Sequence, residues 1–118
     1  LSDEISYVRP HNQTNPSSPA RSGYLAYGTP FSGELAQPGE NVRAPLAAIY
    51  LLGKGPANRI DPVPPAEAAR ALLTNILFFA HEPELVQAVF QTACRLAESV
   101  PVMRLTFFPS ERVWELIQ

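Results

Sequence analysis

Two adjacent carboxylates near the start of the chain are the strongest candidates for chemistry in this sequence. Asp3 and Glu4 lie in the stretch Leu-Ser-Asp-Glu-Ile, at what the pattern predicts to be a strand edge. Neighbouring carboxylates can hold Mg²⁺ through one or two oxygens and water, and one of them can accept a proton from an attacking hydroxyl. An acidic pair at such a position is more often plain solvated surface, so the pair alone leaves both interpretations open.

Other residues of catalytic types have simpler structural interpretations. Gly53-Lys54-Gly55 resembles a phosphate loop at a glance, but it lacks the preceding glycine spacing and the following helix, so we interpret it as a turn. His11 and His81 lie in loop contexts and are interpreted as surface or capping residues. Cys94 lies on a helix and is interpreted as a small buried apolar residue.

Composition narrows the class of protein. The chain has 118 residues, 46% of them hydrophobic, with 9 basic and 11 acidic residues and a formal net charge of -2. The hydrophobic fraction argues against a fully disordered chain. The near-neutral charge argues against an electrostatic surface for nucleic acid or membrane. We expect one domain over residues 1–118.

The cysteine content predicts a cellular location, and the first residue bears on whether the chain is a fragment. A single cysteine cannot form an internal disulfide, so we expect a reducing, cytoplasmic location. The missing initiator methionine is weak support for a fragment of a larger protein.

Hydrophobic periodicity predicts an α/β fold. The seven apolar residues of 46–52 suit a strand buried on both faces in the middle of a covered sheet, with a short buried helix as the alternative. Residues 10–23 are predicted to be an exposed, flexible loop that joins the first two strands in a hairpin. The other predicted strands cover 3–9, 24–27, 58–61 and 102–108, and the predicted helices cover 65–80, 83–100 and 111–116.

The expected architecture is one mixed β-sheet with a helix pair packed on it. Ser110 is expected to cap the last helix, which Trp114 is expected to dock into the core. The predicted core consists of Ile49, Leu51, Leu72, Ile76, Val89, Phe90 and Leu105.

Several stretches carry a family resemblance. Leu1–Ile5, Tyr27–Glu34 (Tyr-Gly-Thr-Pro-Phe-Ser-Gly-Glu) and Pro45–Leu52 resemble the C-terminal part of HPr serine kinase-like proteins. These P-loop proteins are related to HPr kinase/phosphorylase and, more distantly, to phosphoenolpyruvate carboxykinase. The likeness covers almost the whole chain apart from the 10–23 loop, and it continues through Asn58–Ile60, Pro65–Ala68 and Val100–Trp114.

The resemblance implies a partial P-loop kinase-like fold and a set of site residues. Asp3 would position the metal or act as the base, with Glu4 beside it. A loop near the nucleotide or the acceptor would follow, and Arg43 would be a candidate phosphate contact. The loop residues that match the family are Gly28, Thr29, Gly33 and Glu34.

The resemblance also implies cofactors and partners. A full-length parent would use ATP and Mg²⁺ to phosphorylate a serine of a protein or peptide, or would work in reverse as a phosphorylase or phosphatase. The Walker A loop is missing from this sequence, so we expect the chain alone to be inactive. The alternative is a non-catalytic protein-interaction module. In either case we expect a homodimer, with no nucleic-acid or membrane partner.

Overall fold

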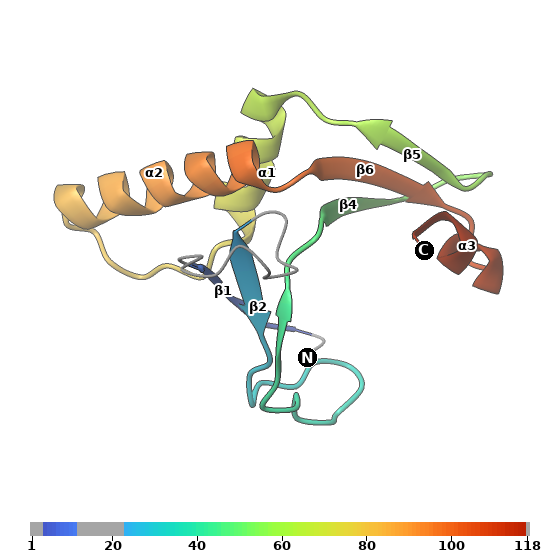
Figure 1. Ribbon diagram of the computed structural model, residues 1–118, viewed down its shortest axis with the longest axis horizontal. Helices are drawn as coiled ribbons and strands as arrows, with labels where there is room; N and C mark the ends of the chain where they lie inside the picture. Colours follow the sequence, from blue (N-terminus) through green and yellow to red (C-terminus); the bar gives the residue numbers. More distant parts are fainter. Residues whose placement is uncertain (1–3, 12–22, 118) are drawn as a thin grey trace. The chain divides into compact units, whose positions relative to one another are not determined.

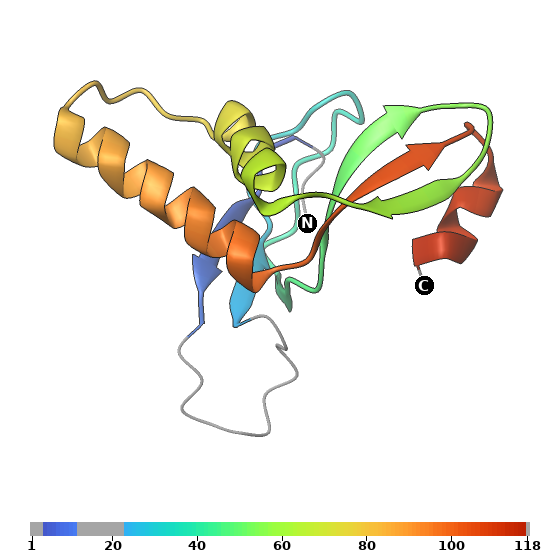
Figure 2. The same cartoon turned by 90° about the horizontal axis from the view of Figure 1, so that it is seen from above.

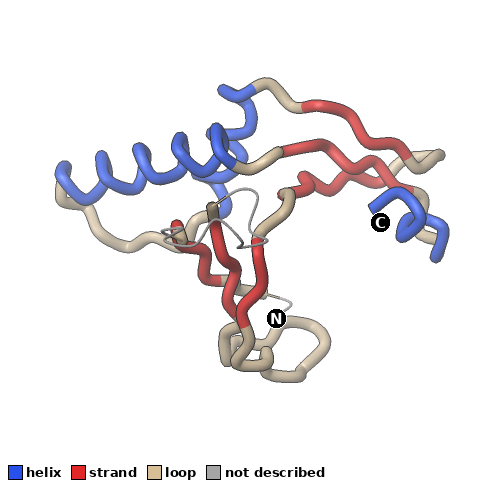
Figure 3. The backbone as a smooth tube through the Cα atoms, in the orientation of Figure 1, coloured by secondary structure: helices blue, strands red, loops and turns tan. Residues whose placement is uncertain are grey.

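The strands form two small sheets instead of the single mixed sheet that was predicted (Figures 1 and 3). The computed structural model describes residues 4–11 and 23–117. The chain divides into two compact units, Leu1–Ala47 and Ala48–Gln118, each with one three-stranded sheet. The helices of the described ranges all belong to the second unit, and their combination with the strands confirms the α/β class.

The sheet of the first unit contains β1 (Tyr7–Pro10), β2 (Tyr24–Tyr27) and β3 (Arg43–Pro45), with β2 in the middle. Both pairings are antiparallel, which confirms the predicted hairpin of the first two strands. Tyr7 faces Tyr27 across this pair, with ring centroids 5.9 Å apart in an edge-on arrangement that favours aromatic contact. The strand begins at Tyr7, four residues after the expected start, and most of the predicted 10–23 loop lies outside the described residues.

The sheet of the second unit contains β4 (Ile49–Lys54), β5 (Arg59–Pro62) and β6 (Val102–Phe107), with β6 in the middle. β4 runs parallel to β6, and β5 runs antiparallel to it. A parallel pair requires a long crossover connection, and here β5 and two helices provide it.

The prediction for residues 46–52 was wrong in two respects. The strand begins at Ile49, and within the described part of the chain it lies at an edge of its sheet. Leu52 is 69% exposed, so the strand is not buried on both faces. An apolar run indicates a strand but not its place in the sheet, which depends on the residues that pair with it.

Two helices connect β5 to β6, and both begin at the predicted prolines. α1 covers Pro65–Asn75 and α2 covers Pro83–Ser99. α1 ends five residues before the predicted Ala80, at a point where the side chains of Thr74 and Asn75 both donate to the carbonyl of Ala71. Such side-chain bonds compete with the continuing helix ladder, and Ile76 already has an extended backbone.

The helix pair lies beside one end of the β4–β6–β5 sheet, not packed on its face as expected (Figures 1 and 2). α2 leads into β6 through Val100 and Pro101 alone, so its C-terminal end adjoins the sheet while the rest of the helix extends away. An ion pair between Glu67 of α1 and Arg104 of β6 links the helices to the strands.

This placement explains why the predicted core is only partly correct. Leu105 is 2% exposed, as expected, and Val100 is equally buried. Phe90 is 53% exposed, because most of α2 projects beyond the strands, and Ile76 is also exposed. Both were wrongly placed in the core.

The chain ends in a short 3₁₀ turn, η1 (Glu111–Val113), followed by α3 (Trp114–Ile117). The predicted helix is confirmed, but Ser110 makes no side-chain capping bond. Trp114 is 64% exposed, so the prediction that it docks into the core was wrong. The four-residue helix α3 does not bury the indole. In the described ranges, no helix is both long enough and apolar enough to cross a membrane.

Candidate functional site

The register of the β1–β2–β3 sheet gathers the predicted site residues at one end. Tyr27, the last residue of β2, pairs with Tyr7 at the start of β1 and with Arg43 at the start of β3. The segments that enter β1, leave β2 and enter β3 therefore meet at the same end of the sheet. Glu4 and the Gly28–Thr29 segment belong to these segments, whereas Asp3 lies outside the described residues.

Two hydrogen bonds fasten the Gly28–Thr29 segment to both of its neighbours. The Thr29 hydroxyl donates to the carbonyl oxygen of Ile5, which directly follows Glu4. The backbone N–H of Gly28 donates to the carbonyl of Val42, at 2.9 Å, and Arg43 follows that residue. Three segments that are far apart in sequence are thus held together by backbone and side-chain contacts.

The remaining site residues lie in the connection from β2 to β3, which leaves and re-enters the sheet at this same end. Gly33 accepts a hydrogen bond from the backbone N–H of Ala36, at 3.1 Å, in a turn. Ala36 has a φ of 52°, a conformation that costs a residue with a side chain about 1–2 kcal/mol. The turn holds Glu34 on the surface.

The charged side chains of this site are open to solvent. Glu4, Glu34 and Arg43 are all exposed, and no ion pair joins them in the described part of the chain. Exposed charges are screened by salt, so contacts among these three contribute little to stability.

The donor set is compatible in kind with Mg²⁺. Carboxylate oxygens are its usual protein ligands, and one or two of them commonly suffice when phosphates and water complete the shell. Residues 4–11 and 23–117 contain no cluster of three metal-ligating side chains. The role of Asp3 as a metal ligand stays a prediction.

The other residues of catalytic types are distributed over the second unit, apart from His11. Gly53 and Lys54 belong to the end of β4, and the chain reverses only after Gly55, so the segment is a strand end followed by a turn. Cys94 is half-buried instead of buried, because α2 projects from the sheet. His81 is exposed in the α1–α2 connection.

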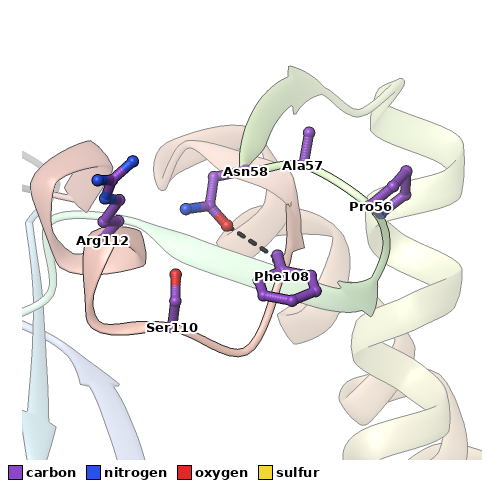
Figure 4. Close-up of a pocket in the computed structure, with 6 residues that line it drawn as sticks. All are labelled: Pro56, Ala57, Asn58, Phe108, Ser110 and Arg112. Carbon is purple, nitrogen blue, oxygen red and sulfur yellow. Dashed lines mark hydrogen bonds between the residues drawn. The ribbon is translucent and has the colours of Figure 1, made fainter.

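Sequence reasoning missed a hollow in the second unit. It lies between the β4–β5 turn and the segment after β6, and has a volume of about 360 Å³ (Figure 4). No motif signals it, because its two walls are about 50 residues apart in the sequence; its lining residues are Pro56, Ala57, Asn58, Phe108, Ser110 and Arg112.

Comparison of the chain with protein-family models, curated proteins and solved structures finds no match.

Proposed function

We propose that this chain is the C-terminal part of an HPr serine kinase-like protein and contributes the acidic and acceptor-loop side of a phosphoryl-transfer site. The substrates are ATP and a serine of a protein or peptide. The phosphate-binding loop belongs to a longer chain, in which the strands described here form part of a P-loop kinase-like fold. By itself, the 118-residue chain is inactive.

The observation that carries this proposal is the hydrogen bond from the Thr29 hydroxyl to the Ile5 carbonyl. It joins two of the segments that carry the family resemblance, the acidic stretch at Leu1–Ile5 and the Tyr27–Glu34 stretch. Residues that act on one substrate must lie close together, and the sheet register together with this bond supports that grouping.

In the proposed site, a bound Mg²⁺ would offset the charge of the phosphoryl group that ATP donates. Asp3 would either help to hold this metal or orient the serine hydroxyl and accept its proton. Glu4 adds negative charge beside it, and Arg43 contacts a phosphate oxygen. The loop that contains Gly33 and Glu34 contacts the nucleotide or the acceptor.

The test is phosphoserine formation by a longer chain that includes the phosphate-binding loop. Serine peptides and ATP serve as substrates, and the Asp3→Asn variant is compared with the wild type. We expect turnover to fall by about 10²–10⁴, the usual contribution of a positioned base, with the fold unchanged by circular dichroism.

Glu40→Gln is the matched control, because Glu40 is an exposed carboxylate in the same unit and its backbone carbonyl is unaffected. It should retain wild-type turnover. Wild-type turnover in Asp3→Asn would reduce Asp3 to a surface carboxylate and overturn its proposed role.

A second candidate function, a protein-interaction module, has an observation of its own. The connection after α1 exposes Leu77, Phe78 and Phe79, and α2 exposes Leu85 and Phe90. Clustered exposed apolar side chains commonly mark protein contacts. Self-association of the chain without any phosphoryl transfer by a longer chain would favour this candidate.

A further inference from the structure

The hollow in the second unit is open to solvent, and its lining combines polar donors with apolar side chains. It lies between the turn Pro56–Asn58, which joins β4 to β5, and residues 108–112, which follow β6 (Figure 4). Its volume of about 360 Å³ falls within the range of small-ligand pockets, about 300–1,000 Å³.

Asn58 is held in one orientation at the edge of this hollow. Its side-chain oxygen accepts a hydrogen bond from the backbone N–H of Phe108, at 2.8 Å. Only the oxygen of an amide side chain can accept from an N–H, so the position of the NH₂ group is fixed as well. Figure 4 shows this nitrogen pointing to the side on which Arg112 lies, where it can donate to a ligand.

Ser110 and Arg112 add two more donor groups. In the described part of the chain, the Ser110 hydroxyl makes no capping bond and Arg112 forms no ion pair. Figure 4 shows both side chains rising from the segment after β6 toward the side of Asn58. The lining contains a positive charge and no carboxylate, and such a group of donors suits an oxyanion.

The rest of the lining is apolar. Phe108 is 55% exposed, and Pro56 and Ala57 extend the apolar wall along the opposite turn. An inorganic ion would leave this surface in water, whereas a ligand with a ring or a short hydrocarbon body would cover it. The ligand therefore has an anionic head and an apolar body.

We propose that this hollow binds a small organic oxyanion, a carboxylate or a phosphate ester, carried on an aromatic or short apolar body. Arg112 and the Asn58 amide hold the head group with the Ser110 hydroxyl, and Phe108 contacts the body. This binding site is independent of the proposed phosphoryl-transfer site, because none of its residues belongs to the first unit.

The test is an NMR titration of the 118-residue chain with four probes: phenyl phosphate, benzoate, inorganic phosphate and benzyl alcohol. Phenyl phosphate or benzoate should bind at least about tenfold more tightly than the other two probes, with amide shifts at residues 56–58 and 108–112. The tighter of these two identifies the preferred head group.

Two variants test the donors. Arg112→Gln should weaken binding by about tenfold or more, since it removes the charge. Asn58→Asp keeps an oxygen that can accept the hydrogen bond from the Phe108 N–H, but it replaces the amide NH₂ group with a second, negatively charged oxygen. Because this oxygen repels an anion, the variant should abolish binding. Arg95→Gln removes the same charge from the exposed side of α2 and should leave binding unchanged.

Three results would each overturn the proposal. They are wild-type affinity in Arg112→Gln and Asn58→Asp, equal affinity for inorganic phosphate and phenyl phosphate, and no amide shift around the hollow at millimolar phenyl phosphate or benzoate.

Discussion

At the scale of single residues, the hydrogen bond from Thr29 to Ile5 joins two of the segments that contain proposed site residues. The side chain of Thr29 is part-buried, and its hydroxyl reaches a backbone carbonyl 24 residues earlier in the chain. A buried or half-buried carbonyl that loses its donor is costly.

We therefore predict that Thr29→Val destabilises the chain by about 0.5–1.5 kcal/mol, because valine has the same shape without the donor. Chemical denaturation followed by circular dichroism measures the change. Thr92→Val is the control, since its hydroxyl bonds only to a carbonyl within its own exposed helix, and it should cost less. Equal stability of the wild type and Thr29→Val would show that this bond contributes nothing.

The site residues could be named from the sequence but not brought together by it. Thr29 and Arg43 were selected through a family resemblance, whereas their proximity depends on the register of the strands. A register is set by pairs such as Tyr7 with Tyr27, and no local pattern reveals which residues will face each other. The hollow around Asn58 was missed for the same reason.

At the scale of the secondary-structure elements, the strongest local constraint lies at the end of β4. A side chain at Gly55 would place its first carbon 2.5 Å from the Thr106 methyl group on β6. Threonine is stiff at this position because it branches next to the backbone, so the methyl group cannot easily move away. At Gly53, by contrast, an added carbon meets no atom within 4 Å in the described structure.

Gly55→Ala should therefore destabilise the second unit by about 1–3 kcal/mol, the usual cost of overpacking. Gly53→Ala is the matched control and should be neutral or slightly stabilising, because it restricts the unfolded chain without a clash. Thermal unfolding of the two variants measures the difference. Indistinguishable melting temperatures would contradict the close approach of the chain at Gly55.

The sequence predicted most of the helices and strands, but it predicted their ends and the burial of their side chains less well. The proline starts of α1 and α2 were correct because proline favours the first helical turn. The end of α1 was missed because apolar spacing continues through Ile76 and Leu77, while the polar pair before them ends the helix. The exposure of Phe90 follows from where α2 lies, which periodicity does not determine.

At the scale of the whole molecule, the open strand edges and exposed apolar side chains predict self-association. Among the described strands, β2 is paired on both sides, whereas β1 lies at an edge of its sheet and has an open side. An open strand edge can pair with a second copy, and a symmetric dimer is the commonest result.

We predict a homodimer that buries more than about 1,000 Å² in total, with β1 in the interface. Light scattering at micromolar concentration determines the mass. Val8→Lys places a charge on the open-edge strand β1 and should shift the mass toward the monomer. A wild-type monomer at this concentration would contradict the prediction.

We propose above all that the chain carries one side of a phosphoryl-transfer site and lacks the other. Calorimetric titration with Mg²⁺–ATP tests it most directly, with the 118-residue chain and the longer chain measured side by side. We expect a micromolar site in the longer chain and no more than weak binding in the short one, because its sequence lacks the phosphate loop whose backbone N–H groups would hold ATP. A micromolar site in the 118-residue chain, or no binding by the longer chain, would contradict it.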